Sequence, residues 1–136
     1  MGKYIGLGAR ECQPAALLAK LDDATLERLR QQVPGWRVVP SSAAAPDGAS
    51  LQCVRREWAA RDPAAAEELA ARLRGVAQQA GHAPLAVAVQ GAAVAAELAT
   101  PAAGGLTEND FIVASRLNAL EGVDALLEKK RQRFWA

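Results

Sequence analysis

The sequence predicts an α+β domain in which three helices cover one face of a four-stranded antiparallel sheet. Two pairs of short strand-like segments are each separated by turn residues, and three further segments carry apolar residues at helical spacing. These segments follow the order α-β-β-α-β-β-α. Strands joined by short turns pair antiparallel, and three apolar helix faces need a common apolar surface to cover. The length of 136 residues suits one such domain.

The first helix is predicted to begin at residues 21–23 and to end at Pro34-Gly35. Asp22 or Asp23 can accept hydrogen bonds from the free amides of its first turn. Apolar residues then recur at helical spacing, at Leu26, Leu29 and Val33. Residues 1–20 are rich in glycine and show no clear period, so we expect an irregular arm.

The first strand pair is expected at residues 36–39 and 51–58, with Trp58 as its large anchor. Residues 40–49 contain two prolines, two serines and an Asp47-Gly48 pair, which predicts a loop between the strands. Aromatic residues make up only 4% of the chain, so we expect a core of Leu, Val and Ala with few ring contacts.

The second helix has a clear start at Asp62-Pro63, where an acceptor side chain precedes a proline at the first helical position. Gly81 stands where a helix end favours a left-handed residue. Between them runs one apolar stripe, formed by Leu69, Leu73, Val76 and Ala80.

The second hairpin is predicted from alternating apolar residues at 85–90 and 94–99, with Gly91 in the turn. The other face of this hairpin carries mostly alanine, whereas a sheet face in water carries polar side chains. We therefore expect something to dock there. Ala86, Ala88 and Glu97 are the candidate partner contacts.

The third helix is expected to follow a flexible Gly104-Gly105 joint, because Thr107 and Asp110 form a capping-box-like start. Its buried stripe is Val113, Leu117 and Leu120, and Gly122 breaks or kinks it. Residues 122–136 are predicted to form a helical extension that is basic and aromatic at its end.

The end of this extension offers a second set of candidate partner contacts. Trp and Arg are enriched at interface hot spots, which points to Arg133, Phe134 and Trp135. The alternative is a solvated, frayed terminus.

Composition excludes several classes of function. The net charge of +1 argues against a nucleic-acid binder. No stretch approaches the roughly 20 apolar residues that cross a bilayer, and the first 20 residues lack a secretory signal.

Cys12 and Cys53 are expected to be free thiols in a reducing compartment, because two cysteines are too few for a disulfide scaffold and no paired metal-binding spacing is present. We expect a cytoplasmic protein.

His82 is the only histidine, and it lies in Gly81-His82-Ala83-Pro84 between the second helix and the third strand. A histidine at this place often favours the negative end of the helix dipole. A metal site needs three or four ligands, so a lone histidine does not predict one. We expect neither a metal nor a cofactor.

Several motifs together resemble the pterin-4a-carbinolamine dehydratases. They are Gly35-Trp36, the helix start Asp62-Pro63, His82-Ala83-Pro84, and the run from Ala103 to Phe111 that reads AGGLTENDF. The resemblance covers roughly residues 21–121, which we expect to form the domain. It implies the same sheet with three helices, in dimers or tetramers.

The resemblance also implies catalytic positions, and this chain keeps only some of them. His82 matches the first histidine of a His-His-Pro motif, and Asp110 matches the aspartate at the last helix start. The family's second and third histidines fall on Ala83 and Pro101, which cannot transfer a proton. The family's aromatic residues fall near Ala86 and Gln90. We therefore expect no enzyme, with His82 and Asp110 as vestiges.

A branch of this fold that lacks the catalytic histidines is associated with α-carboxysomes and Rubisco assembly. The chain is similar to it in its fold motifs, its missing histidines and its terminal extensions. This implies an assembly factor for Rubisco subunits, associated with the carboxysome, and we expect a homodimer because two-fold dimers are the commonest assembly. The alternative is a dehydratase that uses His82 and Asp110 in a reduced site.

Overall fold

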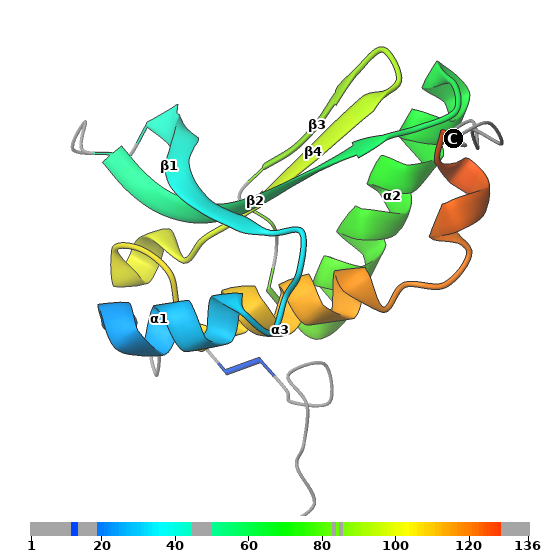
Figure 1. The fold of residues 1–136 in the computed structure, drawn as a ribbon. Coiled ribbons are helices and arrows are strands. Elements are labelled where there is room, and N and C mark those ends of the chain that lie inside the picture. Colours follow the sequence, from blue (N-terminus) through cyan, green and yellow to red (C-terminus); the bar gives the residue numbers. More distant parts are fainter. Residues whose placement is uncertain (1–11, 14–18, 45–49, 83, 85, 129–136) are drawn as a thin grey trace, which may run out of the picture.

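The computed structural model describes residues 12–13, 19–44, 50–82, 84 and 86–128. It confirms the predicted α+β architecture: one four-stranded antiparallel sheet with its helices on one face (Figure 1). The strand order is β1-β2-β4-β3, so β1 and β3 are the two edges. The strands are β1 (Arg37–Ala44), β2 (Ser50–Ala59), β3 (Ala86–Gln90) and β4 (Ala93–Leu98). The helices are α1 (Asp23–Arg30), α2 (Pro63–Ala80) and α3 (Glu108–Asn118), with 3-10 turns η3 (Pro101–Ala103) and η4 (Val123–Leu126).

Helix α2 begins and ends where the sequence predicts. The Asp62 side chain accepts a 2.7 Å hydrogen bond from the backbone N–H of Ala65, and Pro63 occupies the first turn. Gly81 then adopts a left-handed conformation with φ of 79°, which a residue without Cβ does at low cost. This turn carries the chain from the end of α2 toward His82.

Strand β1 is longer than predicted. It continues through Pro40, which pairs with Gln52, and a register irregularity lies between Pro40 and Ala44. Proline lacks a donor and is tolerated on an edge strand, where one side of the strand needs no pairing. The proline-rich composition therefore indicates an edge strand here, and the loop predicted at 40–49 is too long.

The C-terminal extension is less helical than predicted in its described part. A single 3-10 turn, η4, follows Gly122, and Leu127 then forms an antiparallel bridge with Ala60. The predicted contacts Arg133, Phe134 and Trp135 lie outside the described residues.

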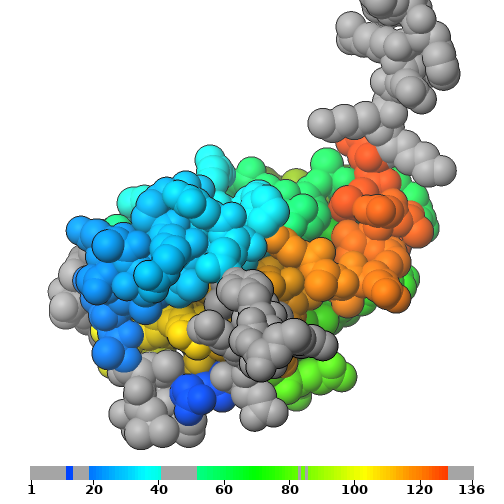
Figure 2. Space-filling model, turned by 60° about the horizontal axis from the view of Figure 1, so that its bottom comes forward, coloured from blue at the N-terminus to red at the C-terminus, as the bar shows by residue number. Residues whose placement is uncertain are grey.

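Part of the predicted N-terminal arm is docked on the helices. Asn109 is 1% exposed and makes two hydrogen bonds with the backbone of Gln13. Its Oδ1 accepts from Gln13 N–H at 2.9 Å, and its Nδ2 donates to Gln13 O at 2.8 Å. Figure 2 shows the segment 12–13, in dark blue, on the side of the molecule where the helices lie.

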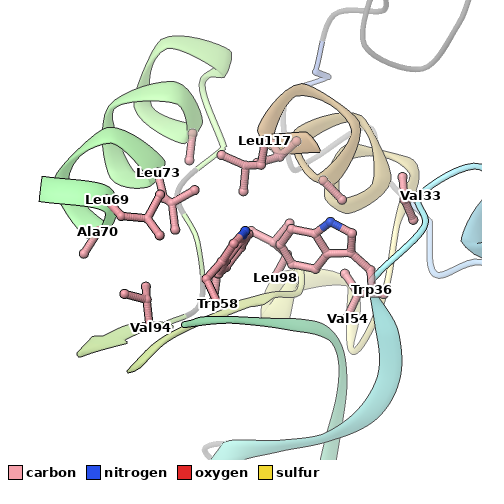
Figure 3. Close-up of a cluster of buried hydrophobic side chains, with 14 of the residues drawn as sticks. Val33, Trp36, Val54, Trp58, Leu69, Ala70, Leu73, Val94, Leu98 and Leu117 are labelled. Atoms are coloured by element: carbon pink, nitrogen blue, oxygen red, sulfur yellow. The ribbon is translucent and has the colours of Figure 1, made fainter. Parts of the chain in front are cut away.

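The core lies between the sheet and the helices (Figure 3). Trp36 and Trp58 meet edge to face there, with ring centroids 5.8 Å apart and an interplanar angle of 82°. This edge-to-face pair lies among the Leu, Val and Ala side chains that the composition predicts for the core. Trp36 Nε1 donates a 2.8 Å hydrogen bond to Oδ1 of Asn118, which anchors the start of β1 to the end of α3.

Candidate functional site

His82 lies directly after α2 and points toward the start of α3. Its backbone N–H donates to Ala77 O at 3.1 Å, which closes the helix end. Its side chain is 13% exposed, and Nε2 lies 2.6 Å from Oδ1 of Asp110. The two residues that match the dehydratase motifs are therefore hydrogen-bonded to each other.

Asp110 is fully buried at the third position of α3. Its Oδ2 accepts hydrogen bonds from the backbone N–H of Thr107 and from the hydroxyl of Thr100, both at 3.0 Å. Thr107 and Asp110 form the predicted capping box. The carboxylate is therefore held from two sides, by the start of α3 and by Thr100, two residues after the end of β4.

A pocket of about 630 Å³ opens beside His82. Arg74 and Gln78 reach it from α2, one helical turn apart, and Arg74 Nη2 donates to Val87 O at 3.1 Å. Its lining residues are Arg74, Gln78, Gly81, His82, Pro84, Ala86 and Val87. A pocket of this size fits a small bicyclic molecule.

The structure separates Pro101 from this lining. Pro101 is the first residue of η3 and is exposed, and it is not among the residues that line the pocket. Ala83 lies outside the described residues. Of the four positions implied by the dehydratase resemblance, the structure brings His82 and Asp110 together.

The predicted partner contacts fall in three different environments. Ala86 is half-buried and lines the pocket beside His82. Ala88 is exposed and lines a groove of about 490 Å³ over β2, β3 and β4. Glu97 is 2% exposed, and its carboxylate accepts a 2.7 Å ion-paired hydrogen bond from Arg55, so it is engaged within the chain.

Sequence reasoning missed Thr100, Arg74 and Gln78. Thr100 has no pattern of its own, because its role depends on where β4 brings it relative to α3. Arg74 and Gln78 are four residues apart within the predicted helix, and this helical spacing, which puts both on one face, was a usable signal.

The geometry defines a class of protein, namely an α+β domain with a histidine–carboxylate pair beside a pocket. The family model described as pterin 4 alpha carbinolamine dehydratase matches residues 19–120. The chain belongs to this family.

Curated relatives agree with this assignment. A chloroplastic and a mitochondrial protein of Arabidopsis thaliana, both named for pterin-4-alpha-carbinolamine dehydratase, are 31% and 32% identical over 97% and 91% of this chain. The chain spans 56% and 64% of their own lengths. A protein of Chlorobium limicola named for the same activity is 35% identical over 70% of this chain and 77% of its own length.

A solved structure supports the fold alone. It is described as a transcriptional coactivator/pterin dehydratase from Brucella melitensis and matches with a TM-score of 0.58 and 21% identity. The match covers 74% of this chain and 96% of that one.

The expectation that the chain is not an enzyme is wrong. It rested on the missing imidazoles at Ala83 and Pro101, whereas the matching family and the relatives above are named for an enzyme. The loss of single motif residues did not identify a non-enzymatic branch.

Two further features of the described residues bear on the site. They contain no cluster of three or more His, Cys, Asp and Glu side chains that could hold a metal ion. None of their helices is long and apolar enough to cross a membrane.

Proposed function

We propose that this chain dehydrates a pterin-4a-carbinolamine in the pocket beside His82. The observation that carries the proposal is the 2.6 Å hydrogen bond between His82 Nε2 and Asp110 Oδ1 at the edge of that pocket. Membership of the dehydratase family supports the choice of reaction.

The reaction removes the 4a-hydroxyl group and a proton from the adjacent ring nitrogen, which together leave as one molecule of water while a C=N bond forms. An imidazole can perform such proton transfers near neutral pH. Asp110 holds one ring nitrogen of His82, so the other nitrogen is left to exchange a proton with the substrate. Arg74 and Gln78 supply hydrogen-bond donors to the polar edge of a pterin.

The proposed site works with one imidazole. Each positioned acid or base contributes about 10²- to 10⁴-fold to a rate. Ala83 and Pro101 supply no such group. We therefore expect dehydration that is measurable but slower than in a member of the family that has three histidines.

The test follows the ultraviolet absorbance of a 4a-hydroxytetrahydropterin mixed with the protein. The wild type is expected to accelerate its loss, and His82→Ala is expected to remove this acceleration. Glu67→Gln is the control, since Glu67 is exposed on α2 and does not line the pocket. Equal rates with wild type and with buffer would refute the proposal.

A second candidate function is assistance in Rubisco assembly by a homodimer near the carboxysome. The groove over the sheet favours it, because small side chains at Ala88, Ala93 and Ala95 leave room for a client segment. The test expresses Rubisco subunits with and without this chain and measures soluble holoenzyme. Ala95→Arg should lower the yield if the groove holds the client, and an unchanged yield without the chain would remove this candidate.

A further inference from the structure

We infer that Thr100 is a positioning residue for His82. Acting through Asp110, it holds the proton of the neutral imidazole on Nε2 and leaves Nδ1 as the nitrogen that accepts a proton. The catalytic consequence of this inference rests on the proposed function, whereas the position of the proton is measurable without any substrate.

The direction of each hydrogen bond around Thr100 follows from counting hydrogens. An ionised carboxylate can only accept, so the 3.0 Å contact between Thr100 Oγ1 and Asp110 Oδ2 uses the single hydroxyl hydrogen of Thr100. Thr100 Oγ1 also lies 2.8 Å from Thr107 Oγ1. The hydrogen in that second contact must therefore come from Thr107.

The hydroxyl of Thr107 is free to donate in this way. In the capping box its oxygen faces the backbone N–H of Asp110, which donates to the Thr107 carbonyl at 3.1 Å, and the hydroxyl hydrogen is left for Thr100. The result is a closed loop of hydrogen bonds: the Thr107 hydroxyl donates to Thr100, and the Thr100 hydroxyl and the Thr107 amide both donate to Asp110 Oδ2. Thr100, Thr107 and Asp110 are at most 3% exposed, so water does not compete for these donors.

The loop determines what Asp110 presents to His82. With two donors at Oδ2, from Thr100 and from the amide of Thr107, the carboxyl group remains an acceptor at Oδ1. The hydrogen in the 2.6 Å contact then belongs to Nε2 of His82. Without the Thr100 hydroxyl, Oδ2 loses one donor in a buried place, and the carboxyl group can turn or share the proton.

The test uses the fact that the chain has a single histidine. A protein labelled with ¹⁵N in histidine reports the proton position of His82 by NMR without assignment. The measurement is made at a pH where the ring is neutral. We expect Nε2–H in wild type and in Thr100→Ser, and a mixture with Nδ1–H in Thr100→Val, which has nearly the same shape. A wild-type ring with its proton on Nδ1 would overturn the inference.

Kinetics separate this inference from the proposed function. Thr100→Val should lower kcat about tenfold, the size of one lost hydrogen bond, with KM nearly unchanged, and Thr100→Ser should restore most of it. If the wild type dehydrates no pterin but shows the expected NMR result, the proposed function fails and the positioning role stands. If Thr100→Val keeps both the wild-type tautomer and kcat, the positioning role fails. Should Thr100→Val not fold, Thr100→Ala replaces it, since it also lacks the hydroxyl, and an unchanged tautomer there is equally contradictory.

Discussion

His82 and Asp110 are 28 positions apart in the chain, yet His82 Nε2 lies 2.6 Å from Asp110 Oδ1. The left-handed Gly81 turns the chain out of α2, and the capping box orients Asp110 at the start of α3. The same features that end α2 and begin α3 therefore bring a histidine and a carboxylate together. A capping role and a catalytic role are compatible at Asp110, since each of its oxygens serves a different partner.

Adding an imidazole next to His82 should increase the dehydration rate. We expect Ala83→His to raise kcat by about 10²-fold, because the added group can transfer a proton. Pro101→His should change kcat little, since Pro101 is exposed and does not line the pocket. The measurement is the same absorbance assay, with Ala83→Gln as the control for size and polarity. A rate in Ala83→His no higher than in this control would mean that position 83 does not face the substrate.

Asn118 should be important for stability. Its Oδ1 accepts from Trp36 Nε1 at 2.8 Å and also from Arg56, and its Nδ2 donates to Pro34 O at 3.0 Å. Asn118→Ala leaves the indole N–H of Trp36, a residue 2% exposed, without its acceptor. We expect a loss of about 1–3 kcal/mol in the free energy of unfolding, measured in urea. Asn118→Asp keeps the acceptor and should lose less, and equal losses in both variants would contradict this account.

Cys53 should make the protein less stable at alkaline pH. Burial raises the pKa of its thiol from 9.0 to about 12, with a further contribution from the nearby Glu97 carboxylate. The folded state thus favours the protonated thiol, and this contribution is fully present below pH 9 and is lost as the pH rises toward 12. In denaturant unfolding between pH 9 and 11, wild type should lose stability more steeply than Cys53→Ala. Parallel curves for the two proteins would exclude this role of the thiol.

The fold was largely predictable from the sequence because its signals are local. Asp62-Pro63 and Gly81 mark the ends of α2 through cap and turn chemistry, and Gly91 marks the second hairpin. Pro40 misled the prediction, because proline signals a loop unless the strand is at an edge, and the edge is known only from the strand order.

The candidate site was only half predictable, for a related physical reason. His82 and Asp110 stand in motifs, whereas Thr100 and Arg74 acquire their roles from tertiary neighbours on α3 and β3. The contact between Trp36 and Trp58 also depends on long-range packing, since a low aromatic content does not say where the few rings lie.

A double-mutant cycle on kcat/KM for His82→Ala and Asp110→Asn tests the central claim most directly. If the two residues act as one acid–base pair, each single variant loses activity and the double variant is no slower than His82→Ala alone. Independent, multiplying losses, or full activity in His82→Ala, would contradict the claim that this pair carries the chemistry.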